Sequence, residues 1–230
     1  MWSSMRKWFW LAPALFLVAV ATPLAHAPFE AVAVGPIVVN TTDDELNTDG
    51  DCSLREAIQA ANTDAVVDAC ATGIGTDTIV LQAGLTYTLG IASTSEDANA
   101  NGDLDITDTD GLTIETDVPG STATIDADAI DQVIDMRAGP LTLVDLIVEG
   151  GDAGAATGGG IRAVDGDFTL TRCTVRDNTT SGSGGGIDAR YDLTGGTGTL
   201  TITESTISGN TSGNGGGILF ASGSNLLVDI

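Results

Sequence analysis

The sequence is poor in basic residues and in aromatic residues. Lys and Arg number 8 against 32 Asp and Glu, which gives a net charge of -24, and aromatic residues make up 4% of the 230 residues. A surface of this sign repels phosphate groups, so the composition argues against nucleic-acid binding and against adhesion to anionic lipid. Hydrophobic residues still reach 42%, and the chain holds 30 glycines. Small aliphatic runs broken by glycine are typical of many short β-strands joined by tight turns.

The first 33 residues have the features of an export signal. Arg6 and Lys7 precede an uncharged apolar run, residues 8–21, which is shorter than a transmembrane helix needs. Two A-x-A cleavage sites follow, ending at Ala27 and Ala33. We expect cleavage after Ala33, because a proline directly after Ala27 hinders the peptidase. Ala27 is the second choice, and an uncleaved N-terminal anchor is the alternative. The mature chain then contains no transmembrane span.

Cleavage at either site removes the only histidine, His26, and the only lysine, Lys7. After Ala33 the chain carries six arginines and 31 acidic residues, so its net charge is 6 − 31 = −25. Catalysis by Ser-His-Asp or Cys-His groups is therefore excluded, and so are histidine-ligated metal sites.

Residues 34–90 are predicted to contain one short helix between strands. Ser53 and Glu56 have the spacing of a capping box at the start of the helix. Four apolar residues then recur at i, i+3, i+4 and i+7, which predicts one buried face: Leu54, Ala57, Ile58 and Ala61. Short apolar runs predict strands on either side of the helix, at residues 37–39, 78–81 and 87–89.

The hexapeptide at residues 52–57, Cys-Ser-Leu-Arg-Glu-Ala, resembles the signature of CSLREA-domain proteins. Residues 39–44 (Val-Asn-Thr-Thr-Asp-Asp) and 60–62 (Ala-Ala-Asn) strengthen the resemblance, which covers about residues 37–90. It implies an exported protein in which this segment leads into a right-handed β-helix, and it implies no particular reaction. We expect the helix to cap the open apolar end of that β-helix.

Cys52 and Cys70 lie on either side of the predicted helix. In an exported protein they are expected to form a disulfide, which would stabilise the fold by about 3 kcal/mol. Two unpaired thiols are the alternative. The third cysteine, Cys173, falls on an inward position of the repeats described next, so we expect it to pack in the core.

Three Gly-Gly-Gly-Ile runs begin at residues 158, 184 and 215, spaced 26 and 31 residues apart. Segments 141–151, 168–178 and 200–210 align between them, and their apolar or small positions form four columns. The columns are Leu141, Phe168 and Leu200; Leu143, Leu170 and Ile202; Leu146, Cys173 and Ser205; and Val148, Val175 and Ile207. Steps of two, three and two residues describe two short strands that meet at a corner.

One such coil per repeat predicts an all-β fold, a right-handed parallel β-helix (solenoid) over residues 91–230, with the short helix as N-terminal cap. Four earlier runs are expected to be strands of less regular coils: 104–106, 112–114, 124–125 and 133–134. The glycine runs and terminal asparagines also resemble polymorphic outer-membrane proteins, a resemblance that bears on architecture only. The segment 226–230 is a predicted strand, so we expect a further C-terminal region or a partner chain to cover the open end.

The register of the coils predicts which side chains stack. Asn178 and Asn210 end their segments at the same point, as in an asparagine ladder. Outward threonines are expected to form columns: Thr142, Thr169 and Thr201, and Thr171 with Thr203. Such an array can bind ice or a regular polymer, although β-propensity explains it as well. Two charge pairs are expected between adjacent coils: Arg162 with Asp188, and Glu149 with Arg176.

Two stretches have the spacing of calcium-binding loops, with oxygen donors at alternate positions and a glycine at position six. The first has Glu45, Asn47, Asp49, Ser53 and Glu56, and the second has Asp97, Asn99, Asn101, Asp105 and Asp108. Ca²⁺ is therefore the one cofactor that the sequence suggests. The alternative is that acidic turns arise by composition, and that Glu56 acts only as a helix cap.

The sequence predicts a secreted or cell-surface, outer-membrane-associated module with a structural or adhesive role. A surface polysaccharide or another cell-surface ligand is its expected partner. The alternative is a carbohydrate-active enzyme on a pectate-lyase-like scaffold, either a lyase or a hydrolase. Its groups would come from Arg162, Asp165, Asp167, Arg176, Asp177, Asp188 and Arg190. No catalytic motif is present, so no catalytic residue is assigned. A pocket with three convergent carboxylates, or with a carboxylate–arginine cluster, would favour the enzyme over the structural module.

Overall fold

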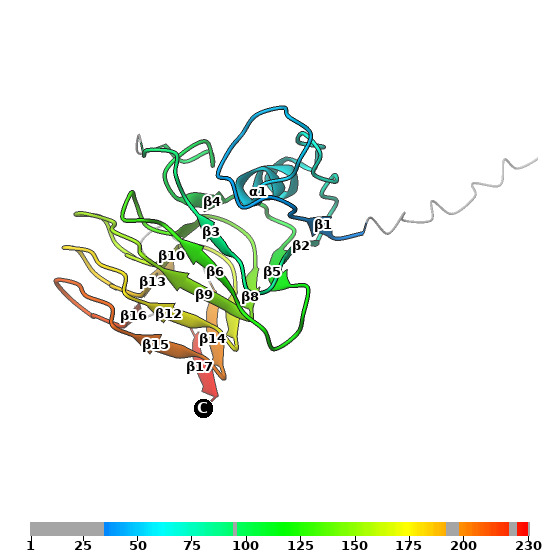
Figure 1. Ribbon diagram of the computed structural model, residues 1–230. Helices are drawn as coiled ribbons and strands as arrows, with labels where there is room; N and C mark the ends of the chain where they lie inside the picture. Colours follow the sequence, from blue (N-terminus) through cyan, green and yellow to red (C-terminus); the bar gives the residue numbers. More distant parts are fainter. Residues whose placement is uncertain (1–34, 94–95, 192–197, 221–224, 230) are drawn as a thin grey trace, which may run out of the picture. The chain divides into compact units, whose positions relative to one another are not determined.

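The computed structural model describes residues 35–93, 96–191, 198–220 and 225–229. The predicted signal peptide lies outside these residues. The described strands form three parallel sheets, stacked in register as successive coils (Figure 1). The predicted fold class, an all-β parallel β-helix with one short helix near the N-terminus, is confirmed.

The first sheet has seven strands, in the order β1, β2, β5, β8, β11, β14, β17. Their bounds are β1 Ile37–Val38, β2 Asp77–Leu81, β5 Leu112–Thr116, β8 Leu141–Val144, β11 Phe168–Thr171, β14 Thr199–Thr203 and β17 Asn225–Asp229. Side chains on this sheet alternate inward and outward, as the pleat of a strand requires. Leu141, Phe168 and Leu200 pair in register and are fully buried, which confirms the first predicted column.

The second and third sheets have five strands each. The second contains β3 Thr86–Thr88, β6 Ala123–Asp126, β9 Leu146–Glu149, β12 Thr174–Arg176 and β15 Thr206–Ser208. The third contains β4 Leu104–Ile106, β7 Ile134–Met136, β10 Ile161–Ala163, β13 Ile187–Ala189 and β16 Ile218–Phe220. Each regular coil therefore has three strands, whereas the repeat pattern predicted two. The third strand begins directly after each glycine run.

The corner between the first two strands of a coil depends on a left-handed backbone. Asp145, Arg172 and Glu204 occupy this position in successive coils, with φ of 58°, 52° and 50°. Arg172 donates to both carboxylate oxygens of Asp145, at 2.7 and 2.8 Å. This ion pair holds the pKa of the Asp145 carboxyl below its usual value. In each coil the predicted bend is therefore made by one residue with a strained, positive φ. Two of these residues, Asp145 and Arg172, also pair with each other between adjacent coils.

The asparagine ladder is confirmed. The side-chain oxygen of Asn178 accepts from the Gly151 N–H at 2.8 Å, and that of Asn210 accepts from the Asn178 N–H at 3.0 Å. Each Asn amide also donates to the end of a neighbouring strand, to Val148 O or Val175 O. The ladder therefore satisfies backbone groups that the turn leaves out of the sheets.

The glycine runs permit close approach between coils. A Cβ on Gly185 would lie 2.5 Å from Gly216 O and 2.6 Å from Thr211 O. The first glycines of the runs, Gly158 and Gly184, have φ of +75° and +66°. Larger side chains at these positions would push successive turns apart.

Two predicted charge pairs have different outcomes. Glu149 and Arg176 are register partners and form an ion pair. Arg162 and Asp188 are also register partners, but the guanidinium of Arg162 turns to the preceding coil and pairs with Asp135. The predicted threonine columns are confirmed by register, and Cys173 is buried in the core, where burial raises its pKa to about 11.

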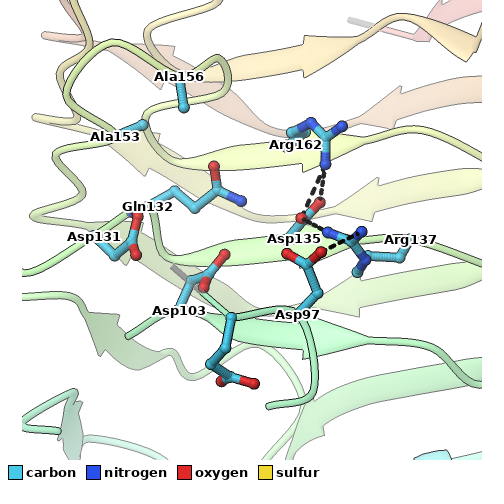
Figure 2. A pocket seen from close by; sticks show the side chains of 10 residues that line it. Asp97, Asp103, Asp131, Gln132, Asp135, Arg137, Ala153, Ala156 and Arg162 are labelled. Carbon is cyan, nitrogen blue, oxygen red and sulfur yellow. Dashed lines mark hydrogen bonds and ion pairs between the residues drawn. The ribbon is translucent and has the colours of Figure 1, made fainter. Parts of the chain in front are cut away.

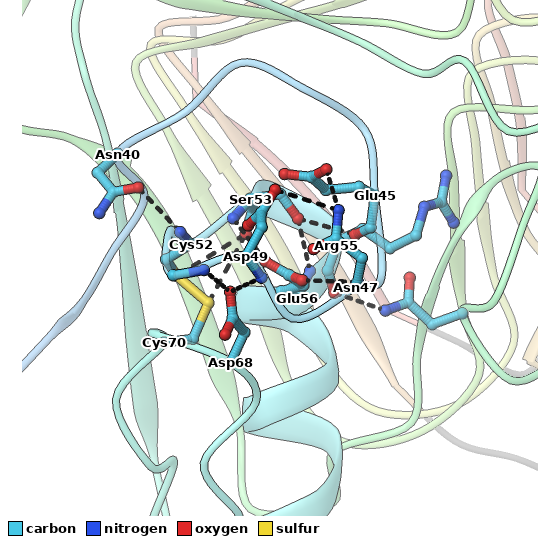
Figure 3. Close-up of a disulfide and its surroundings, with 12 residues drawn as sticks. Asn40, Glu45, Asn47, Asp49, Cys52, Ser53, Arg55, Glu56, Asp68 and Cys70 are labelled. Carbon is cyan, nitrogen blue, oxygen red and sulfur yellow. Dashed lines mark hydrogen bonds between the residues drawn. A yellow bond between two sulfur atoms is a disulfide. The ribbon is translucent and has the colours of Figure 1, made fainter.

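The helix α1, Leu54–Thr63, lies against β2 and against β4, the edge strand of the third sheet. The capping box between Ser53 and Glu56 is present, and Leu54, Ala57, Ile58 and Ala61 are buried as predicted. The disulfide Cys52–Cys70 is formed (Figure 3). The strands β2 and β3 pair with β5 and β6, so the segment 34–90 continues directly into the coils. Among the described residues, no helix is long and apolar enough to cross a membrane.

Candidate functional site

Within the hexapeptide at residues 52–57, Arg55 of the helix α1 has a fully buried side chain. Its guanidinium donates to both oxygens of Asp44, at 2.6 and 3.1 Å. It also donates to two backbone carbonyls, Gly102 O at 2.8 Å and Asp103 O at 2.9 Å. The same Asp44 carboxylate accepts the N–H groups of Gly90 and Ile91. Arg55 and Asp44 therefore fix both ends of the loop between β3 and β4.

Asn62, at the other end of the helix, closes the edge of β4. Its amide donates to Asp105 O at 2.8 Å, and its oxygen accepts from the N–H of Thr107 at 2.8 Å. An exposed strand edge is a template for pairing with other chains. Side chains of α1 occupy this edge, which gives the expected capping role a hydrogen-bond basis.

The loop and the third sheet form a charged pocket of about 380 Å³ (Figure 2). Five acidic side chains line it together with two arginines and Gln132: Glu96, Asp97, Asp103, Asp131, Asp135, Arg137 and Arg162. Pockets of this size accommodate small ligands or a short stretch of polymer. The register places Asp135 beside Asp105 of the coil before and beside Arg162 of the coil after.

The two arginines converge on Asp135 (Figure 2). Arg162 Nη1 lies 3.0 and 2.9 Å from its two oxygens, and Arg137 Nη1 lies 2.7 Å from Oδ2. Arg137 also reaches Asp97, at 2.9 Å. Burial nevertheless raises the pKa of Asp135, because the two guanidiniums oppose the loss of solvation without cancelling it.

Two further aspartates are buried here: Asp103, which lines the pocket, and Asp105, which lies beside Asp135 on the neighbouring strand. Burial raises the pKa of Asp103 to about 8, and the negative charges of Asp105, Asp131 and Asp135 add to it. Burial likewise raises the pKa of Asp105 to about 6. The raised pKa of Asp103 favours its protonated form near neutral pH, in which the carboxyl donates a hydrogen bond, while the carboxyl oxygens of the lining accept.

The predicted calcium residues of the second stretch are divided between several places. Asp97 and Asp105 come together with Asp135. The side chain of Asn99 turns inward and donates to Arg55 O at 2.9 Å. The backbone N–H of Asn101 donates to the Glu96 carboxylate at 2.8 Å, and Asp108 accepts from the Asp110 N–H outside this cluster. The linear spacing of a calcium loop is therefore not reproduced in space.

The first stretch forms a compact acidic loop next to the disulfide (Figure 3). Carboxylate oxygens of Glu45, Asp51 and Glu56 lie within 4.8 Å of one another, and Asp49, Asp51 and Asp68 form a second such group. Partial desolvation, together with the charges of Asp49 and Asp51, raises the pKa of Glu45 to about 7.

Hydrogen bonds hold the first stretch in place, while Glu45 Oε1 and Asp51 Oδ1 are buried without a hydrogen-bond partner among the described residues. Both oxygens of Glu56 accept backbone N–H groups, from Asn47 and Ser53 at 3.0 Å each. The side-chain NH2 of Asn47 donates to the carboxylates of Glu45 and Asp49. The Ser53 hydroxyl donates to the Glu45 carbonyl at 2.9 Å. These bonds make the loop an extended helix cap, the alternative that the sequence left open for Glu56.

Of the residues that the enzyme alternative named, only Arg162 lines the pocket. Arg176 pairs with Glu149 on the second sheet, and Asp188 pairs with Arg190 one coil further along the third sheet. Sequence reasoning missed Asp103, Asp131, Asp135 and Arg137. A usable signal was present: a charged residue between two buried residues recurs at the middle of β4, β7, β10 and β13, as Asp105, Asp135, Arg162 and Asp188.

Comparisons of the chain with protein-family models, with curated proteins and with solved structures found no match in any of the three. The fold and the pocket therefore carry the functional argument by themselves. The disulfide indicates an oxidising, extracytoplasmic environment.

Proposed function

We propose that this chain is an exported, CSLREA-type β-helix of the cell surface or the secreted fraction, and that it binds a glycan in the pocket of the third sheet. One observation carries the proposal: the pocket combines carboxylates with two arginines that are fixed by ion pairs to a single aspartate. Sugar hydroxyls both donate and accept hydrogen bonds, and this lining does the same.

The charges of the pocket argue against other classes of ligand. Five carboxylates disfavour polyanions such as nucleic acids, while Arg137 and Arg162 oppose basic peptides. A neutral polyhydroxylated polymer avoids both costs. The regular spacing of the coils, about 4.8 Å between strands, would also allow a polymer to extend from the pocket along the sheet.

Replacing Arg162 with alanine is expected to weaken glycan binding by about tenfold or more, since a partly buried, charge-assisted contact would be lost. The ligand would first be found on an array of surface polysaccharides and then titrated by calorimetry. Arg176→Ala is the matched control, because Arg176 forms the same kind of ion pair between coils, but on the second sheet. Equal losses in both variants, or an array with no bound glycan, would contradict the proposal.

Glycoside hydrolysis is a second candidate. The pocket meets the criterion set from the sequence for an enzyme, a carboxylate–arginine cluster, and Asp103 is the further observation that favours this activity. A carboxyl that stays protonated near neutral pH can protonate a leaving sugar oxygen, while an ionised neighbour activates water or attacks the sugar. Release of reducing ends from the bound glycan, absent with Asp103→Asn, would establish this activity. Binding without any release would leave the protein a binding module.

A further inference from the structure

We propose that Asp97, Asp105 and Asp135 bind one Ca²⁺ ion beside this pocket. One carboxylate oxygen of each lies within 4.8 Å of the others, although the three residues come from the loop after β3, from β4 and from β7. Asp105 and Asp135 are register partners on adjacent strands, so the stacking of the coils fixes their separation. The inference does not depend on the glycan proposal, because it concerns the ion alone.

A second, independent observation points to a ligand: the carboxylate of Asp105 is fully buried and only half satisfied. Its Oδ2 accepts the Asn99 N–H at 2.9 Å, whereas its Oδ1 has no hydrogen-bond partner in the described structure. Burying a carboxylate oxygen without a partner is costly. A cation within reach of the three aspartates would remove that cost.

Asp188 shows how the same position is satisfied without an ion. It lies further along the same ladder on the third sheet and is also buried. Arg190 donates to both of its oxygens, at 2.6 Å each. At Asp105 the equivalent arginine, two residues further on, is replaced by Thr107. On this ladder, therefore, both oxygens of Asp188 are paired with an arginine, whereas Asp105 has one oxygen without a hydrogen-bond partner in the described part of the chain.

The donor set indicates a hard cation. Three carboxylates are available, and the mature chain has no histidine, so a calcium-like ion suits the site better than zinc. Ca²⁺ accepts six to eight oxygens in flexible geometry, and the open pocket would supply water for the remaining positions. Arg137 bridges Asp97 and Asp135 at 2.9 and 2.7 Å, and its side chain is 30% exposed, so it has room to move off both carboxylates when the ion binds.

The test is calorimetric titration of the purified exported protein with CaCl₂ alone at pH 7.5. We expect saturable binding that Asp105→Asn weakens by about tenfold or more, because the variant removes the buried ligand charge. Asp188→Asn is the matched control from the same ladder and is expected to keep wild-type affinity.

Asp97→Asn keeps the test valid if Asp105→Asn fails to fold, since the Asp97 side chain is 64% exposed. It is expected to weaken binding in the same direction. No heat with millimolar Ca²⁺ would overturn the proposal, and so would binding that both variants leave unchanged. Because no glycan is present, failure here would leave the glycan proposal untouched, and failure of the array would leave this one untouched.

Discussion

Replacing Arg55 with methionine is expected to lower the free energy of unfolding by about 3–5 kcal/mol. The substitution keeps most of the apolar stem but removes four donated hydrogen bonds, two to Asp44 and two to the carbonyls of Gly102 and Asp103. The Asp44 side chain is only 4% exposed, so its charge would lose its buried partner. Breaking one side of a buried ion pair is costly for this reason.

Urea unfolding followed by circular dichroism measures the effect, with the disulfide intact in every sample. Arg176→Met is the control, because its ion pair with Glu149 is more exposed and is worth under about 1 kcal/mol. A loss in Arg55→Met no greater than that of the control would show that the cap does not depend on this network.

Replacing Asp103 with asparagine is expected to stabilise the protein at pH 8–9 by about 2–4 kcal/mol. The physical reason is that burial raises the pKa of Asp103 from 3.8 to about 8. The folded state therefore binds this proton more tightly than the unfolded state does. The resulting stability is fully present below pH 4, and it is lost as the pH rises from about 4 to about 8. Asparagine stays neutral throughout and avoids the loss.

The measurement is the urea midpoint of both proteins between pH 4 and pH 9, with EDTA present to remove divalent ions. The two proteins should have similar stability at pH 4 and diverge as the pH rises. Asp105 contributes in the same direction, with its pKa at about 6, and its charge is coupled to that of Asp103, so the difference between the two curves reports the coupled pair. Parallel curves, or a less stable variant at pH 9, would show that Asp103 ionises freely in the folded state.

The repeats made the fold predictable, because the core positions of successive coils align by simple counting. Phe168 and Leu200 can be paired from the sequence alone, and so can the disulfide and the helix cap around Ser53. The third strand of each coil was missed for a physical reason. Ile161–Ala163 is only three residues long, so it shows one charged residue between two buried ones and no longer alternation.

The pocket was less predictable because it is assembled across coils of unequal length. Asp105 and Asp135 become neighbours only once the register of β4 and β7 is known, and the early coils lack the glycine runs that reveal register later. The calcium-loop spacing included Asn99, whose side-chain NH2 donates to the Arg55 carbonyl and whose Oδ1 is buried without a hydrogen-bond partner within the described residues. The acids that the spacing did bring together, Asp97 and Asp105, meet a third residue that no local pattern contains.

Hydrogen bonds to backbone groups connect the hexapeptide at residues 52–57 with the pocket. Arg55 donates to the carbonyl of Asp103, whose side chain lines the pocket, and Asn99 donates to the carbonyl of Arg55 while its N–H holds Asp105. The helix α1 therefore does more than cover the end of the coils: it positions the acidic groups of the adjacent site.

The most direct test of the account is a map of where the ligand binds. Amide chemical shifts of the ¹⁵N-labelled protein would be followed during titration with the best glycan from the array. The account predicts that the largest shifts fall on the third sheet and its loop, at residues such as Asp103, Gln132 and Arg162. Shifts confined to the outward threonines of the first sheet, Thr142, Thr169 and Thr201, would place recognition on the threonine face and contradict the account.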